Sequence, residues 1–293
     1  MTMGIMDIDN CQLQWERKLF SGNRSQFTPL NAYPTTDLLR KAVFNAYVLL
    51  SRLGNTRLPV SCDDPDFGNK FGVLTTQTKN ILAVMVWNFE DGMDDLVNPR
   101  QLTITLADLP FSGVYTQVHY RIDNTHSSAY NVWAAQGKPE APTLEQVADL
   151  RAAEGLQLYE PVQKVSLIRE HSLTVQLPQH AVSLYLLLPR SWKKPEPPDW
   201  IRAELETNAL QCTQVFLKWQ PSPELDFLHY RLWRSEVAPK AEPALICDNP
   251  SLNTAVYIDT AVESGREYRY YVQVVNAAAV GSDLSTESTV IIP

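Results

Sequence analysis

The sequence is short of the features that nucleotide-binding and nucleic-acid-binding proteins require. Only 11 of its 293 residues are glycine, and no glycine-rich phosphate loop is present, so nothing in it predicts nucleotide binding. Its 25 lysines and arginines are outnumbered by 33 aspartates and glutamates, which gives a formal net charge of −8. Because affinity for nucleic acid depends on clustered lysine and arginine, we expect no nucleic-acid partner.

No apolar run is long enough to cross a membrane as a helix. The most apolar stretch, residues 81–87, is far shorter than the roughly 20 residues that a spanning helix needs, and we interpret it as a buried strand. The first residues show no positively charged region followed by a long apolar one, so the chain as given carries no secretory signal. We expect no membrane partner, and the localisation stays unknown.

Four cysteines are present, and none has the spacing of a metal ligand. No C-x-x-C pair occurs among Cys11, Cys62, Cys212 and Cys247, and no histidine lies at ligand spacing from them. We therefore predict no metal site, and the sequence indicates no cofactor. Cys212 and Cys247 fall in the same C-terminal region, so a disulfide between them and two buried free thiols both stay open.

Short β-forming runs dominate the middle of the chain. With 44% apolar and 10% aromatic residues, the chain is large enough for two well-packed domains. Runs of β-branched, aromatic and aliphatic residues are separated by Gly, Pro, Asn and Asp, which is typical of strands and turns. These runs are residues 71–77, 81–89, 102–106, 114–122, 164–169, 172–177 and 181–188. Strands at that spacing predict a sandwich or a barrel.

An amphipathic helix is predicted over residues 36–53, ahead of the strands. Thr35 or Thr36 is placed to cap its start, and Gly54 follows its end. Apolar residues recur at steps of three and four along one face: Leu39, Val43, Ala46, Tyr47 and Leu50.

A second helix is predicted where the strands are interrupted. Thr143 and Gln146 have the spacing of a capping box, in which the threonine hydroxyl accepts from the backbone N–H three residues on. Leu144, Val147 and Leu150 would form the inner face of this helix.

One long run of unusual residues links the chain to a known family. Residues 120–133 read Tyr-Arg-Ile-Asp-Asn-Thr-His-Ser-Ser-Ala-Tyr-Asn-Val-Trp, followed by Gly-Lys-Pro at 137–139, Pro-Thr-Leu-Glu-Gln at 142–146 and Leu150. This segment resembles the β-sandwich of glycoside hydrolase family 39, the β-xylosidases and α-L-iduronidases. The resemblance also makes the helix at 36–53 similar to the last helix of the family's catalytic barrel.

The same resemblance implies that the catalytic residues lie outside this sequence. Family 39 enzymes are retaining glycosidases, which use one carboxyl group as proton donor and a second as nucleophile. In the family both are glutamates on a (β/α)8 barrel N-terminal to the matching segment, and the donor belongs to an Asn-Glu-Pro motif. No Asn-Glu dipeptide occurs here, so neither glutamate carries over and we predict no catalytic residue.

The last 95 residues or so resemble a fibronectin type III domain. Four prolines between residues 189 and 198 form a stiff connector that marks a domain boundary. Beyond it, Trp219 is expected in the core on an early strand, and Tyr268 is expected to form the tyrosine corner of a late strand.

Two interpretations of the family segment are weighed. Asp123 and His126 are compatible with a base and its orienting carboxylate. We favour a structural signature, in which Asp123 caps the turn, His126 is hydrogen-bonded, and Tyr120, Tyr130 and Trp133 pack. Tryptophans outside this segment are candidates for binding an oligosaccharide. They lie in loops, the linker or a possible edge strand: Trp15, Trp192, Trp200 and Trp233. Packing between domains is the alternative role for these rings.

Together these patterns predict a mainly β protein with two β-sandwich domains, preceded by a helical remnant of a (β/α)8 barrel. The expected domains are residues 1–60, 61–192 and 193–293. The expected function is a truncated, non-catalytic C-terminal accessory portion of a family 39 glycosidase in carbohydrate metabolism, and the alternative is a stand-alone carbohydrate-binding or protein-interaction module. A catalytic barrel supplied by another chain, or self-association through the helix at 36–53, would cover the apolar face of that helix.

Overall fold

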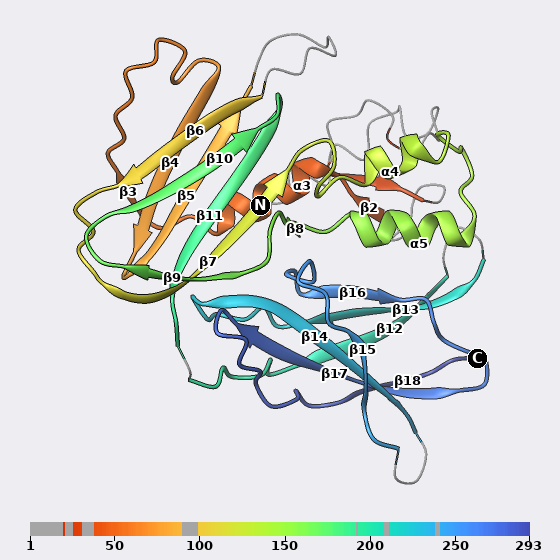
Figure 1. Cartoon of the computed structure of the whole chain (residues 1–293). Coiled ribbons are helices and arrows are strands. Elements are labelled where there is room, and N and C mark those ends of the chain that lie inside the picture. The colour runs from red at the N-terminus through yellow and green to blue at the C-terminus, as the bar shows by residue number, and fades with distance from the viewer. Residues whose placement is uncertain are drawn as a thin grey trace. The chain divides into compact units, whose positions relative to one another are not determined.

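The computed structural model describes residues 20, 26–30, 38–89, 99–191, 193–207, 211–237 and 241–293, which are mainly β (Figure 1). Its residues group into two compact units. One comprises Ala42–Ser128 and Leu156–Ser191, and the other Met1–Lys41, Ala129–Gly155 and Trp192–Pro293. The division at residues 60 and 192 stays a prediction.

The first unit is a β-sandwich of two antiparallel sheets. The larger sheet has the order β3-β4-β5-β11-β7-β8, and β9 also pairs with β7. Its strands are β3 (Thr56–Leu58), β4 (Phe71–Thr78), β5 (Ile81–Asn88), β11 (Ala181–Pro189), β7 (Gly113–Ile122), β8 (Gln157–Leu158) and β9 (Gln163–Leu167). The smaller sheet pairs β6 (Arg100–Leu106) with β10 (His171–Leu177). All seven predicted strands are confirmed, with ends that differ by at most two residues.

The core of this sandwich lies between its two sheets. On β10, Leu173, Val175 and Leu177 are buried while the intervening residues are exposed, as the two-residue period of a strand requires. They pack with Leu82, Val84 and Val86 of β5. The predicted burial of residues 81–87 is thus confirmed for Leu82, Ala83, Val84 and Val86, and the other three residues are half-buried.

Helix α3 (Ala42–Ser51) belongs to the same unit and packs on β7. It is shorter than predicted, because Leu38–Arg40 forms strand β2, which pairs with β1 (Phe27–Pro29). Leu39, in the middle of β2, is fully buried. The helical spacing of apolar residues predicted a helix from residue 36. The hydrogen bonds of residues 38–40 to β1, about ten residues earlier in the chain, make this segment a strand instead.

The face of α3 that is buried within the described residues carries Asn45 and Leu49. Asn45 Nδ2 donates a hydrogen bond of 2.9 Å to Ser127 O. Of the predicted apolar face, Leu39 is fully buried on β2, whereas Val43 is 41%, Tyr47 55% and Leu50 47% exposed. These three side chains of α3 are thus largely uncovered within the described residues.

Two helices, α4 (Ala129–Ala135) and α5 (Leu144–Ala153), form a separate part of the second unit. The capping box of α5 is confirmed, because Gln146 N donates to Thr143 Oγ1 and Thr143 N donates to Gln146 Oε1. Of its predicted inner face, Leu150 is fully buried, but Leu144 is 50% exposed and that part of the prediction was wrong. Helix α4 was not predicted, although Gly137, with φ of +85°, follows it in the conformation that commonly ends a helix.

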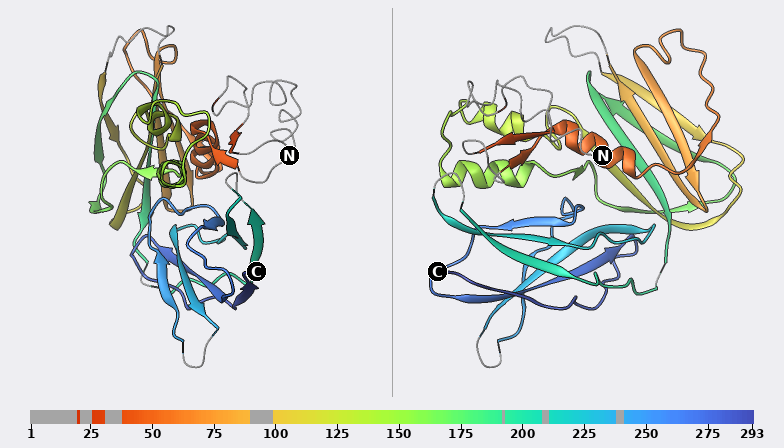
Figure 2. Two further views of the ribbon diagram at one scale, coloured as in Figure 1. Left: turned by 90° about the vertical axis from the view of Figure 1, so that its right-hand side faces the viewer. Right: turned by 180° about the vertical axis from the view of Figure 1, so that it is seen from behind.

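The C-terminal sandwich has a three-stranded and a four-stranded sheet, seen from two further sides in Figure 2. The first orders β12 (Ile201–Thr207), β13 (Thr213–Trp219) and β16 (Val256–Asp259), and the second orders β15 (Ala244–Cys247), β14 (Phe227–Glu236), β17 (Glu267–Asn276) and β18 (Ser288–Ile291). In chain order these sheets are A-B-E and C′-C-F-G, as in fibronectin type III domains.

The two expected marks of that fold are confirmed. Trp219 is almost fully buried on β13, and Tyr268 Oη accepts a hydrogen bond of 3.3 Å from Glu263 N, which is a tyrosine corner. Cys212 and Cys247 are half-buried and no disulfide joins them, and Cys62 is exposed. Cys11 lies outside the described residues.

Candidate functional site

Strand β7 places a row of polar side chains inside the first sandwich. Gln117, His119 and Arg121 occupy alternate positions on the face that also carries the core residue Tyr115. Each of the three is less than 10% exposed. Because a buried polar group without a partner costs free energy, the hydrogen bonds of this row decide what it does.

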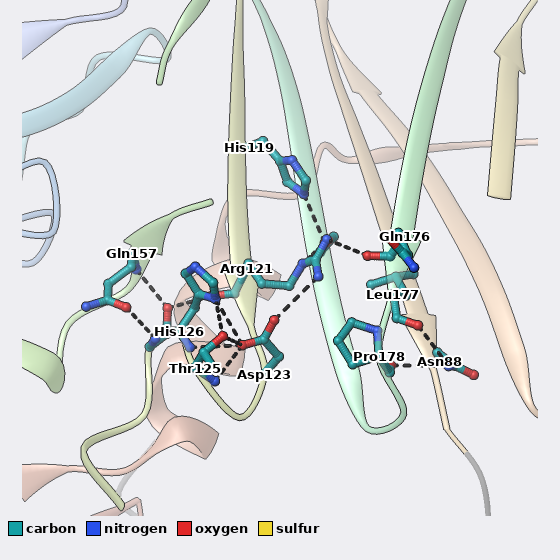
Figure 3. Close-up of polar contacts among 12 residues, drawn as sticks. Asn88, His119, Arg121, Asp123, Thr125, His126, Gln157, Gln176, Leu177 and Pro178 are labelled. Atoms are coloured by element: carbon teal, nitrogen blue, oxygen red, sulfur yellow. Dashed lines mark hydrogen bonds and ion pairs between the residues drawn. The ribbon is translucent and has the colours of Figure 1, made fainter. Parts of the chain in front are cut away.

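Arg121 is the centre of the row (Figure 3). Its Nε donates to Ser183 Oγ at 2.6 Å, and its Nη2 donates to Gln176 O at 3.1 Å. Its Nη1 lies 3.4 Å from Asp123 Oδ2, and its Cζ stands 4.0 Å from the centre of the Tyr159 ring. Ser183 lies on β11 of the larger sheet and Gln176 on β10 of the smaller one, so the guanidinium joins the two sheets.

Further polar contacts join the same sheets. His171 Nε2 of β10 lies 3.1 Å from Gln117 Oε1, and Tyr185 Oη of β11 donates to Thr174 O at 3.3 Å. Asn88 Nδ2 of β5 donates to Leu177 O of β10 at 3.2 Å. With the contact of Arg121, they form four polar contacts between β10 and the larger sheet. The row therefore aligns the two sheets.

His119 connects Ser183 to a carboxylate near the surface. Its Nε2 lies 3.0 Å from Ser183 Oγ, and its Nδ1 lies 3.2 Å from Glu160 Oε1. Burial, together with the nearby charge of Arg121, lowers the pKa of His119 to about 3, so the ring is neutral. A neutral imidazole has one N–H, and Ser183 Oγ already accepts from Arg121. The bonds are then assigned as Ser183 Oγ–H donating to Nε2 and Nδ1–H donating to Glu160.

The order of serine, histidine and carboxylate is that of nucleophilic hydrolases, but the surroundings differ. Ser183 is fully buried on a central strand, and its hydroxyl oxygen accepts a hydrogen bond from Arg121 Nε. A nucleophile needs an open side from which a carbonyl carbon can approach. The serine here has none, so the arrangement supports the sandwich rather than acyl transfer.

The predicted partners Asp123 and His126 are brought together in the turn after β7. Asp123 Oδ1 accepts from Thr125 N at 2.7 Å, from Thr125 Oγ1 at 2.9 Å and from His126 N at 2.9 Å, and His126 Nδ1 lies 3.0 Å away (Figure 3). Burial alone would raise the pKa of Asp123, but the hydrogen bonds from Thr125 and His126 outweigh it and hold the pKa below its usual value. This geometry suits a cap, and the structural role stays a prediction.

The three aromatic residues of the predicted signature do not gather at this turn. Tyr120 is buried on β7, on the face opposite to Arg121. Tyr130 and Trp133 lie on α4 and contact the ring of Phe20 at centroid distances of 5.6 and 5.3 Å. Trp133 Nε1 also donates to Pro139 O at 2.9 Å.

The tryptophans considered for sugar contact are widely separated. Trp15 and Trp192 lie outside the described residues. Trp233 is half-buried on β14, opposite Tyr271 of β17, and its Nε1 is buried without a hydrogen-bond partner among the described residues. Trp200 is 41% exposed beside the guanidinium of Arg202. Sugar contact by these rings stays a prediction.

The sequence reasoning missed His119, Ser183 and Glu160. Polar residues at every second position of an otherwise β-forming run, as in 117–121, were the available signal. Within the described ranges, no three His, Cys, Asp or Glu side chains gather as metal ligands. No helix in the described part of the chain is long and apolar enough to span a membrane.

Comparison with known proteins gives a family match over more than half of the chain. Residues 2–168 match the family model described as glycosyl hydrolases family 39. No curated protein matches the sequence. Among solved structures, the bacterial orthologue of human α-L-iduronidase is similar with a TM-score of 0.76 and 20% identity, over 90% of this chain and 47% of that one. That likeness shows a shared fold, and the chain spans about half of the other protein's length.

Two other solved structures are similar over shorter stretches. A monomeric β-xylosidase from Caulobacter crescentus CB15 has a TM-score of 0.45 and 17% identity, over 52% of this chain and 31% of that one. A fibronectin type III-like protein from Clostridium thermocellum has a TM-score of 0.27 and 23% identity, over 34% of this chain and 96% of that one.

Proposed function

The chain belongs to glycoside hydrolase family 39, and from that premise we propose that it is a non-catalytic accessory portion of a β-xylosidase-like or α-L-iduronidase-like glycosidase. In this proposal a (β/α)8 barrel outside the present sequence hydrolyses the glycoside, and the two sandwiches stabilise that barrel. Helix α3, the expected barrel remnant, is the part of this chain that contacts it.

The exposed face of α3 is the observation that carries this proposal. The ten residues of Ala42–Ser51 include no charged side chain. A helix that faces solvent normally carries charged and polar residues on its outer face, so an apolar outer face is normally covered. Val43, Tyr47 and Leu50 are spaced by four and three residues and lie on one exposed stripe. The stripe is therefore suited to a covering surface of apolar side chains.

A catalytic barrel fits this stripe better than a second copy of the chain. A stable interface between proteins buries about 800 Å² on each partner, which three side chains cannot supply alone. A barrel that also meets neighbouring parts of this chain would reach that area. The similar bacterial protein, described as catalytically competent, has about half of its chain outside the match, which leaves room for such a barrel.

Co-purification with a family 39 catalytic barrel, produced without its own sandwich, tests the proposal. We expect the wild-type chain to bind the barrel and to raise its hydrolysis of an aryl glycoside. The double variant Val43→Glu with Leu50→Glu should lose both effects. Leu144→Glu is the matched control, because Leu144 is a comparably exposed leucine on α5.

Three results would overturn the proposal. They are absence of binding by the wild-type chain, equal binding by the double variant, and equal loss in the control. Light scattering of the chain alone addresses self-association. A dimer that the double variant converts to monomer would show that a second copy covers the stripe.

A stand-alone carbohydrate-binding module is the second candidate function. The observation that favours it is a pair of aromatic residues, Trp87 and Phe89, on the larger sheet.

A further inference from the structure

Two aromatic residues, two positions apart at the end of β5, share the face of the larger sheet that is turned away from the smaller sheet, here called the outer face. Val84 and Val86 point into the core, so Trp87 faces the opposite side. Phe89 N donates to Lys70 O at 2.6 Å, which extends the pairing of β5 with β4 by one residue beyond Asn88. Phe89 therefore shares the outer face with Trp87, about 7 Å along the strand.

The indole of Trp87 lies over the backbone of a glycine on the neighbouring strand β4. Its cross-strand partner is Gly72, and a Cβ at Gly72 would come within 2.2 Å of Trp87 Cζ2 and 2.7 Å of both Cε2 and Cη2. Equal distances to the two neighbours of Cζ2 place the glycine above the ring, since an in-plane position would be farther from both. One face of the indole thus covers Gly72, and the ring is held flat against the sheet.

Solvent reaches the two rings to different extents, because Phe89 is 51% exposed and Trp87 is half-buried. No described residue accepts a hydrogen bond from Trp87 Nε1, and that atom is not buried. The ring of His180, exposed in the turn before β11, stands 5.5 Å from that of Phe89 in an edge contact. The Trp87 N–H is thus a donor beside the accessible parts of the two rings.

We propose that Trp87 and Phe89 form a stacking platform for the pyranose rings of a neutral oligosaccharide. The face of an aromatic ring carries the negative part of its quadrupole, and the C–H groups on a pyranose face are weakly positive, so the two are complementary in charge. Trp87 Nε1–H is available to a sugar hydroxyl. Lys70 lies next to the platform but pairs with Asp66 at 3.7 Å, which favours a neutral sugar over an acidic one.

Simple sheet packing accounts for only part of this arrangement. An aromatic ring over a cross-strand glycine stabilises a sheet, and that would explain Trp87. It does not explain Phe89, which adds little to the core at its exposure. A protein partner would need a larger surface than two rings. A chain of sugar rings matches both the size and the chemistry of the pair.

Calorimetric titration of the full chain with xylohexaose and with cellohexaose tests the platform. We expect at least one of them to bind, and Phe89→Ala to weaken that binding by about tenfold. Ile168→Ala is the matched control, because it removes another exposed apolar side chain of the same sandwich and should leave affinity unchanged. Trp87→Phe should abolish the change in tryptophan fluorescence that the sugar causes. Unchanged melting of Phe89→Ala would exclude misfolding.

The inference fails if neither sugar binds, or if Phe89→Ala and Trp87→Phe bind as the wild type does. Trp200→Ala tests a rival location among the tryptophans considered for sugar contact: loss of binding in this variant but not in Phe89→Ala would place the site on the C-terminal sandwich and also overturn the inference. The α3 double variant should retain the sugar affinity. Failure of the barrel proposal and failure of the platform are therefore separate results.

Discussion

Replacing His119 by glutamine should make the stability of the chain less sensitive to acid. The pKa of His119 is about 3 in the folded chain and about 6.5 in the unfolded one, so the unfolded chain binds the proton more readily. The contribution of the neutral His119 ring to the free energy of unfolding is therefore fully present above pH 6.5, and it is lost as the pH falls toward 3. The loss is about 1.4 kcal/mol for each pH unit, which gives about 2 kcal/mol at pH 5.

Urea unfolding at several pH values between 7.5 and 5 measures this effect. Burial lowers the pKa of His171 and His229 as well, so these residues add losses of the same sign, and only the difference between wild type and variant reports His119. Glutamine can donate to Glu160 and accept from Ser183 without titrating. We expect His119→Gln to be less stable at pH 7.5 but to lose about 2 kcal/mol less than the wild type on going to pH 5. Equal pH dependence of the two chains would refute the neutral, buried assignment of His119.

Two further predictions concern the turn after β7 and the chemistry. Asp123→Ala should lower the melting temperature, because a lost cap costs about 0.5 to 2 kcal/mol and an unpaired buried partner roughly 1 to 3 kcal/mol more; unchanged melting with lost sugar affinity would mean that the turn is a binding site. The purified chain should release no aryl product from aryl xyloside or aryl iduronide, since neither family glutamate is carried over; turnover traced to this polypeptide would contradict that.

Local patterns were predictable from the sequence because their partners lie within a few residues. The capping box joins residues three apart, and so does the contact between Asp123 and His126. The strands were predictable because turn residues separate β-forming runs. In the C-terminal sandwich, Trp219 and Tyr268 have fixed places in a recurrent fold, so their burial and the tyrosine corner followed from the resemblance.

The polar row of the first sandwich could not be predicted in the same way. Residues 115–122 of β7 are buried on both faces, so their pattern does not show which face meets the second sheet. The contact between His119 and Ser183 depends on the pairing of β7 with β11, and these residues are 64 positions apart. The start of α3 was misplaced for a related reason, because β1 recruits residues 38–40 into a strand.

Arg121 also has a consequence for how the first sandwich opens. Its partners on β10 and β11 lie 55 and 62 positions along the chain, in different sheets. Separating the layers would take the Gln176 carbonyl away from the guanidinium while much of the surrounding core stayed in place, and a buried charge that loses a hydrogen-bond partner is costly. Partial opening at this interface is thereby disfavoured relative to complete unfolding. The amides of β7, β10 and β11 should therefore exchange with solvent as one cooperative unit, slowly and together.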